Sequence, residues 1–203
     1  MPNRTFAVFA PAAIAGSLAG RLLGRGDEIF YCTANDADAD ALEPKCGADH
    51  VLAPVEVESS NKMNDAFATM PQELDGIIFC AKESASTKLS ELEFHDFEED
   101  VFTRVLGAFN TFKSGIRSLK TGGCFVFMSG LATSTAIRAA EYALIEDMRK
   151  DDEVVRKNVR IHHIMTPTPS EAPTHVRASV AGVIVKCLEQ EMNQDLVMNP
   201  SSC

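Results

Sequence analysis

Two adjacent histidines are candidates for metal ligands. His162 and His163 lie inside the apolar run Val159–Met165, which predicts a β-strand, and neighbouring side chains of a strand point to opposite faces. A joint metal site therefore has poor geometry, and we predict no metal site here. Ser129 and Cys124 carry nucleophilic atoms, but no base lies close to them in the sequence, so spacing alone supports no covalent catalysis.

The tyrosines and cysteines add no catalytic motif. Tyr142 is one of only two tyrosines, and Glu146, one helical turn later, is an acid that would not help it to release a proton. We therefore expect Tyr142 to be a packing residue. The six cysteines form no C-x-x-C pair and several lie in apolar runs, which predicts reduced core thiols of a cytoplasmic protein. They are Cys32, Cys46, Cys80, Cys124, Cys187 and Cys203.

Composition and charge limit the classes of function. The 203 residues, of which 45% are hydrophobic, suffice for one globular domain covering 1–203. The formal charge is −10, and acids cluster from Asp36 to Glu43 and from Glu91 to Asp100. Such a chain would repel phosphate backbones and anionic lipids, so we expect neither nucleic acid nor a membrane as partner.

Apolar runs alternate with helical patterns along the whole chain. The stretch Phe6–Leu23 follows Arg4 and could be a secretory signal, but Pro11 and the regular pattern beyond it favour a strand and a helix. The predicted strands are Thr5–Phe9, Asp27–Cys32, His50–Leu52, Gly76–Ala81, Cys124–Ser129, Val159–Met165 and Leu196–Met198. The predicted helices are Ile14–Arg25, Ala37–Cys46, Ser60–Met70, Phe102–Leu119, Thr135–Lys150 and His175–Glu191. This alternation predicts an α/β fold, a doubly wound Rossmann-type parallel sheet of about seven strands with helices on both faces.

Two of these helices carry unusually broad apolar surface. In Phe102–Leu119 one stripe of large residues stands roughly opposite a small-residue face that includes Ala108. In Thr135–Lys150 apolar residues surround most of the helix. Burial deep in one domain and a subunit interface explain this pattern equally well. The residues we assign to an interface are Phe102, Leu106, Ala108, Phe109, Phe112, Ala136, Ala140 and Leu144.

The order of the elements and several local strings resemble the short-chain dehydrogenase/reductase family over nearly the whole chain. After the first strand, Phe9–Gly16 stands where the family has T-G-x-x-x-G-x-G, and only Gly16 matches. Asp75–Lys82 resembles the string D-x-x-x-N-N-A-G of the fourth strand, without its asparagines. Arg104–Asn110 is similar to N-L-x-G-A-F, with Arg104 at the asparagine that supports the proton relay of the family.

The family's catalytic side chains are missing from the matching positions. Gly130 stands where the catalytic serine is expected, with Ser129 beside it, and Y-x-x-x-K has become Ser134-x-x-x-Arg138. Pro167–Pro169 resembles the P-G-P segment after the sixth strand. Because Ser134 cannot act as the acid at ordinary pH, the resemblance implies a fold that has lost hydride-transfer chemistry.

The turn that would hold a dinucleotide has also changed. Pro11 has no N–H to donate to a pyrophosphate, Ile14 would put a branched side chain in the cofactor's path, and Ala10 adds a methyl group. The residues Thr33–Asn35 offer neither an acid for a ribose hydroxyl nor an arginine for a phosphate. We therefore predict no dinucleotide cofactor, and we expect the side chains of this turn to fill the crevice.

Two loops that surround the substrate in active relatives are short here. Only Leu131–Thr133 precede Ser134, and few residues separate Pro169 from the helix that begins near His175. Both loops are therefore too short to provide the residues that surround the substrate in active relatives.

Three functions compete on this evidence. The first is a non-catalytic subunit that pairs with an active member of the family in a heterodimer or heterotetramer, as the resemblance implies for dehydrogenases of hydroxyacyl-CoA compounds such as (hydroxybenzyl)succinyl-CoA. The second is a small-molecule sensor or regulator, and the third is a divergent NAD(P)-dependent reductase. A neighbouring gene with an intact Y-x-x-x-K motif would favour the first, a signalling or DNA-binding neighbour the second, and turnover by the chain alone the third.

Overall fold

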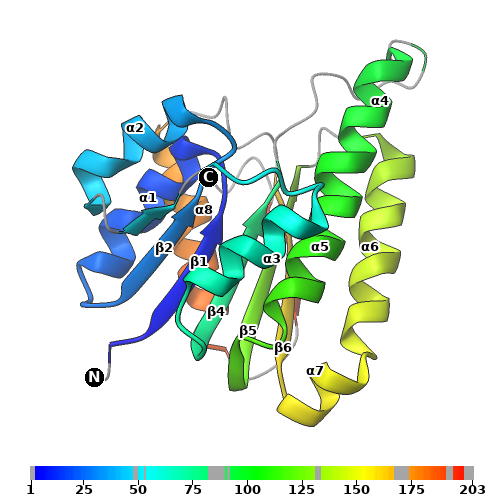
Figure 1. The fold of residues 1–203 in the computed structure, drawn as a ribbon. Helices are drawn as coiled ribbons and strands as arrows, with labels where there is room; N and C mark the ends of the chain where they lie inside the picture. The colour runs from blue at the N-terminus through cyan, green and yellow to red at the C-terminus, as the bar shows by residue number, and fades with distance from the viewer. Residues whose placement is uncertain are drawn as a thin grey trace.

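One parallel sheet organises the chain (Figure 1). The computed structural model describes residues 3–47, 50–52, 54–81, 90, 92–130, 134–166, 174–190 and 194–198. The strands are β1 (Thr5–Phe9), β2 (Glu28–Cys32), β3 (Val51–Leu52), β4 (Leu74–Cys80), β5 (Leu119–Gly130), β6 (Arg160–Thr166) and β7 (Gln194–Val197). They pair in the order β3-β2-β1-β4-β5-β6-β7. The predicted seven-stranded Rossmann-type sheet is therefore confirmed.

The helices cover both faces of this sheet. They are α1 (Ala12–Leu23), α2 (Asp36–Cys46), α3 (Ser60–Thr69), α4 (Phe94–Asp100), the π-helical segment η2 (Val101–Leu106), α5 (Gly107–Gly115), α6 (Thr135–Arg149), α7 (Asp152–Lys157) and α8 (Thr174–Cys187). Figure 1 shows α3, α5 and α6 in front of the sheet and α1 and α8 behind it.

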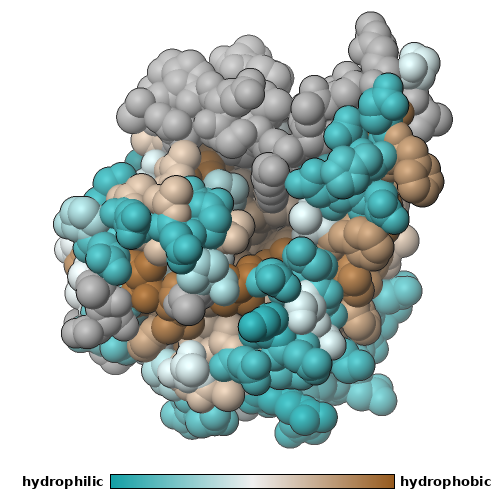
Figure 2. Space-filling view, turned by 45° about the horizontal axis from the view of Figure 1, so that its top comes forward, coloured by the Kyte–Doolittle hydropathy of each residue, from teal (hydrophilic) through white to brown (hydrophobic). Residues whose placement is uncertain are grey.

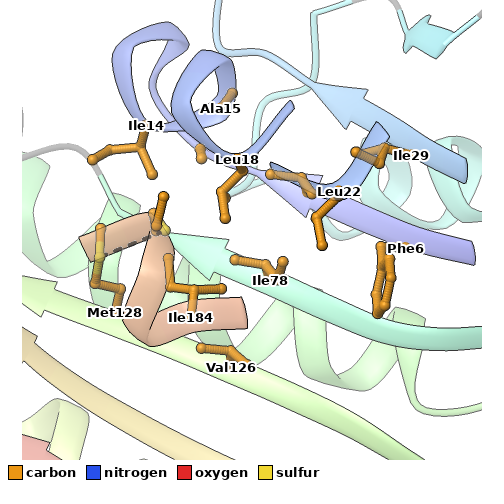
Figure 3. Close-up of a cluster of buried hydrophobic side chains, with 14 of the residues drawn as sticks. Phe6, Ile14, Ala15, Leu18, Leu22, Ile29, Ile78, Val126, Met128 and Ile184 are labelled. Carbon is orange, nitrogen blue, oxygen red and sulfur yellow. Dashed lines mark hydrogen bonds between the residues drawn. The ribbon is translucent and has the colours of Figure 1, made fainter. Parts of the chain in front are cut away.

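Each face of the sheet has its own apolar cluster, because successive strand side chains alternate between the faces. Behind the sheet, Ile14, Leu18 and Leu22 of α1 meet Ile184 of α8 and strand residues such as Ile78 (Figure 3). In front, α3, α5, α6 and α7 cover a second cluster that is rich in phenylalanine. The continuous apolar strands thus follow from burial on both sides.

The long helix Phe94–Gly115, formed by α4, η2 and α5, differs from its prediction. It begins eight residues before Phe102, and it ends at Gly115 because the chain turns and enters β5 at Leu119. The π-helical turn in its middle changes the direction of the side chains that follow, so a constant helical period does not describe its two faces. This shift alters which residues are buried, as described below.

Candidate functional site

A crevice lies at the carboxyl ends of β1, β2 and β4, where the strand order reverses. Open parallel sheets bind their ligands at this place. The cavity has a volume of about 460 Å³. Its described lining comprises Phe9, Ala10, Pro11, Cys32, Thr33, Ala34, Asn35, Asp38, Val55, Glu56, Val57, Glu58, Phe79, Cys80, Ala81, Glu99 and Thr103.

The first side of this crevice has no glycine-rich loop. Only Ala10 and Pro11 separate β1 from α1, and the Pro11 carbonyl accepts hydrogen bonds of 3.0 Å from the amides of Ile14 and Ala15. Residues 12–16, which we aligned with the family's turn, therefore belong to α1. Gly16, the one matching glycine, faces α2, where an added Cβ would lie 3.1 Å from Lys45 Nζ.

The side chain of Ile14 does not occupy the crevice. It is buried in the cluster behind the sheet, near Met128 and Ile184 (Figure 3). The prediction that Ile14 blocks the cofactor's path is wrong, because α1 begins two residues earlier than expected and turns this side chain towards α8. A cavity remains beside Ala10 and Pro11 instead.

The second side of the crevice is acidic. Asn35 caps α2 by accepting a 2.9 Å hydrogen bond from the amide of Asp38, and Asp36 is the first residue of the helix. Asp38, Glu56 and Glu58 line the cavity, and none of its described lining residues is a lysine or arginine. Carboxylates repel phosphate groups, and Pro11 removes one amide donor. The described residues therefore do not fit a dinucleotide.

The positions that match the family's catalytic residues have structural roles here. Ser134 is the N-cap of α6, and its hydroxyl accepts a 3.3 Å hydrogen bond from the amide of Ile137. Arg138 donates to the hydroxyl of Thr135, at 3.2 Å. Gly130 is the buried last residue of β5. None of these contacts activates a proton donor.

A buried ion pair occupies the place of the family's asparagine. Arg104 in η2 donates from Nε to Oε1 of Glu141 in α6, at 3.1 Å, and the two side chains are 1% and 5% exposed. Burial raises the pKa of Glu141, while the Arg104 charge and a hydrogen bond from the Ser129 hydroxyl oppose that rise. Arg104 thus joins two helices in the interior.

Ser129 extends this polar contact to the sheet. Its Oγ lies 2.8 Å from Nε2 of His163 on β6, and both residues are buried. Burial lowers the pKa of His163 to about 4, so its imidazole is neutral near pH 7. We call Arg104, Glu141, Ser129 and His163 the buried network. Its members resemble catalytic residues in type, and each of them is at most 5% exposed.

The second histidine stands apart from this network. His162 points to the opposite face of the sheet, as predicted, and its ring nitrogens have no hydrogen-bond partner among the described residues. No group of three or more potential ligands able to hold a metal occurs in the described ranges. Burial also raises the pKa of the Cys124 thiol to about 12, which leaves it an unreactive core residue.

The helices α4 to α6 present an apolar face to solvent. Phe94, Phe102 and Phe109 are 79%, 45% and 40% exposed, and Tyr142 is 46% exposed. The α6 alanines Ala136, Ala139, Ala140 and Ala143 are exposed beside them. Figure 2 shows hydrophobic residues on the side of the molecule where these helices lie. We call this surface the helix-pair face. The packing role predicted for Tyr142 holds on one side only: its ring centroid lies 6.4 Å from that of the buried His163, but the residue is 46% exposed.

The predicted interface residues separate into two groups. Phe102, Phe109, Ala136 and Ala140 are exposed, and Leu106 and Leu144 are half-buried. Ala108 and Phe112, in contrast, are buried in the front cluster, so assigning them to an interface was wrong.

The small-residue face of α5 explains this correction. It packs on the sheet, where a Cβ on Gly115 would lie 2.5 Å from Cδ1 of Ile77, and one on Gly107 would lie 3.2 Å from Cζ of Phe79. The small residues therefore allow this helix to pack closely on the sheet, and the aromatic residues Phe102 and Phe109 face the solvent.

Several expected features lie outside the described residues: the short loop Leu131–Thr133, the Pro167–Pro169 segment with the short connection that follows it, Lys82 and Cys203. Among the described helices, none has the length and apolar character that a membrane span requires.

Comparison with known proteins supports the fold. The sequence matches no family model and no curated protein. Solved structures do match. A short-chain dehydrogenase/reductase from Brucella melitensis, titled a glucose/ribitol dehydrogenase, has a TM-score of 0.79 at 16% identity, covering 97% of this chain and 95% of its own. BdcA, solved in complex with NADPH, has a TM-score of 0.78 at 14% identity, covering 96% and 92%. A short-chain dehydrogenase/reductase mutant from Serratia marcescens has a TM-score of 0.73 at 14% identity, covering 96% of both. The chain therefore has the fold of these dehydrogenases and reductases along nearly its full length.

Proposed function

We propose that this chain is a non-catalytic member of the short-chain dehydrogenase/reductase family that supports an active dehydrogenase subunit. The observation that carries this proposal is the helix-pair face. It leaves aromatic rings exposed on α4, η2 and α5 next to an alanine-rich side of α6. Several large apolar side chains exposed on one side of a domain favour an interaction site there.

The state of the candidate site supports a role without chemistry. Ser134 is a helix cap, and Arg104 is held by Glu141 in the interior. No described residue at these positions has the phenol or amine that the family's reaction uses. The chain has kept the fold of a dehydrogenase while its polar side chains bond to one another.

The partner that fits this face is the corresponding helix pair of a related subunit with an intact Y-x-x-x-K motif. Two such pairs would pack as four helices with their aromatic and alanine surfaces in contact, giving a large apolar interface of the obligate kind. The result would be a heterodimer or a heterotetramer. We place the complex in the cytoplasm, where the buried thiols stay reduced.

Co-expression with a gene-neighbouring relative, followed by light scattering coupled to size-exclusion chromatography, tests this proposal. We expect a stable heteromer, and we expect the chain alone to self-associate or precipitate. Ala140→Glu should break the complex by burying an unpaired carboxylate. Ala41→Glu, on the exposed side of α2, is the matched control and should have no effect. Ala108→Glu is unsuitable, because Ala108 is in the core.

Two results would overturn the proposal. One is a soluble monomer at high micromolar concentration that ignores any co-expressed relative. The other is dehydrogenase turnover by the purified chain. The double variant Ser134→Tyr with Arg138→Lys should remain inactive, since catalytic groups of this kind act only as a complete set.

A further inference from the structure

The crevice at the carboxyl ends of β1, β2 and β4 keeps the size of a ligand site. Its volume of about 460 Å³ lies within the range of roughly 300–1,000 Å³ that small-molecule sites occupy. The inner wall is apolar and buried, with Phe9, Cys32, Val55 and Phe79 all less than 8% exposed. A ligand with a flat or aliphatic body could cover this wall.

The rim of the same cavity carries the charge. Asp38 comes from α2, Glu56 and Glu58 come from the segment after β3, and the described lining contains no cationic side chain. Carboxylates above a low-dielectric wall concentrate positively charged molecules. The formal charge of −10 adds to this field. The described rim therefore attracts cations more than anions.

The segment that carries Glu56 and Glu58 is held in place by several contacts. The amide of Val55 donates to the Thr33 carbonyl at 2.8 Å. Asn110 of α5 donates from its side-chain amide to the carbonyls of Val57 and Glu58, at 3.1 and 2.9 Å. These bonds fix the backbone of the rim before any ligand arrives, which lowers the entropic cost of binding.

One polar group in the lining lacks a partner. Thr33 is 2% exposed, and its Oγ1 makes no hydrogen bond with any described residue. A buried hydroxyl without a partner costs about 1–3 kcal/mol. A ligand that donates to or accepts from this hydroxyl would recover that cost, so Thr33 points independently to an occupant.

We propose that this crevice binds a small organic cation with an apolar body, such as an aromatic or aliphatic amine. The body would lie on the Phe9 and Phe79 wall, and the ammonium group would lie between Glu56 and Glu58. A bare metal ion is a poorer occupant, because no described residues gather as a ligand set and the wall is apolar. This proposal does not depend on the assembly proposed above, because none of the exposed residues that define the helix-pair face lines the cavity.

A fluorescent amine provides a direct test. The chain has no tryptophan, so the indole emission of tryptamine can be followed in the presence of the whole protein. Anisotropy titration of the full chain in low salt should give saturable binding of tryptamine. Indole-3-propionate has the same ring and linker with a carboxylate, and it should bind about tenfold or more weakly.

Two variants and a control locate the site. Glu56→Gln with Glu58→Gln should weaken tryptamine binding about fivefold or more. Glu43→Gln with Glu73→Gln removes the same charge at exposed positions outside the cavity and should change binding less than about twofold. Thr33→Val should weaken binding while leaving the protein at least as thermally stable, because it removes the unpaired hydroxyl.

Three outcomes would overturn the proposal: no saturable binding of tryptamine, equal binding of indole-3-propionate, or equal loss in the control variant. The last would show attraction by net charge alone. None of these outcomes bears on the oligomeric state, so failure here is distinguishable from failure of the subunit proposal.

Discussion

Removing one member of the Arg104–Glu141 pair should destabilise this protein more than any change at an exposed ion pair. The nitrogen and oxygen are 3.1 Å apart, and both side chains are at most 5% exposed. At an effective dielectric constant of about 20, that distance corresponds to an attraction of about 5 kcal/mol. Breaking such a pair from one side typically costs about 3–5 kcal/mol, because the other charge stays in the interior.

The double replacement should behave differently. Arg104→Met with Glu141→Leu fills a similar volume without any charge, and such exchanges are often neutral or stabilising. We therefore expect Arg104→Met and Glu141→Leu each to lose about 3–5 kcal/mol, and the double variant to lose far less than their sum. A domain of ordinary stability, roughly 5–15 kcal/mol, should survive each single change only marginally.

Urea unfolding followed by circular dichroism measures these differences as shifts of the midpoint at constant slope. The control is the ion pair Lys150–Asp147, in which Nζ and Oδ1 are 3.8 Å apart. Its side chains are 71% and 82% exposed. Asp147→Ala should cost less than about 0.5 kcal/mol. This expectation would be refuted if each single variant lowered the free energy of unfolding by less than about 1 kcal/mol and the two losses added up in the double variant. That result would show that the pair is solvated and not buried.

Three further changes test the packing, the helix cap and the pH response. Gly115→Ala should destabilise by about 1–3 kcal/mol in thermal unfolding, because its Cβ would meet Ile77 at 2.5 Å, whereas Gly20→Ala, with nothing within 4 Å, should stabilise slightly. Ser134→Ala removes the α6 cap and should cost about 1 kcal/mol by urea titration; no loss would mean that the cap is dispensable. Burial lowers the pKa of His162 to about 4, so the unfolded chain binds its proton first as the pH falls. Stability should decline from about pH 6.5 towards pH 4, because His162 and His163 each contribute a loss of at most about 1.4 kcal/mol per pH unit, and His162→Leu should remove one of these two contributions.

The strands could be predicted from sequence because burial on both faces leaves a continuous apolar signal. The predicted strand Thr5–Phe9 coincides with β1, and the run Gly76–Ala81 covers β4 except for its first two residues. Helix ends were harder to predict. The sequence around Pro11 matches a family turn in position, but proline is well suited to the start of a helix, and α1 begins directly after it.

The faces of the long helix could not be predicted from period alone. The π-helical turn at Val101–Leu106 changes the angle between the side chains before and after it. As a result Ala108 turned inward and Phe109 outward. The glycines could have indicated the inner face of this helix, because Gly107 and Gly115 are eight residues apart on the side that contacts the sheet.

Glu141 is the site residue that sequence analysis missed. It lies between Ile137 and Ile145 at helical spacing, on the inner face of α6. A charged residue among buried apolar neighbours is rarely left unpaired, and Arg104 stands among apolar residues of the preceding helix in the same way. Two opposite charges on the inner faces of consecutive helices were therefore the signal for their contact.

The buried network holds together the helices that carry the helix-pair face. The contacts Arg104–Glu141, Glu141–Ser129 and Ser129–His163 connect η2 and α6 to β5 and β6. A directional polar connection specifies one relative placement of two helices more narrowly than apolar packing does. A docking face made of two helices requires such a fixed placement, since a change in their angle would separate the aromatic and alanine surfaces. The buried network thus fixes the relative placement of the two helices that carry the helix-pair face, which is a condition that the subunit proposal requires.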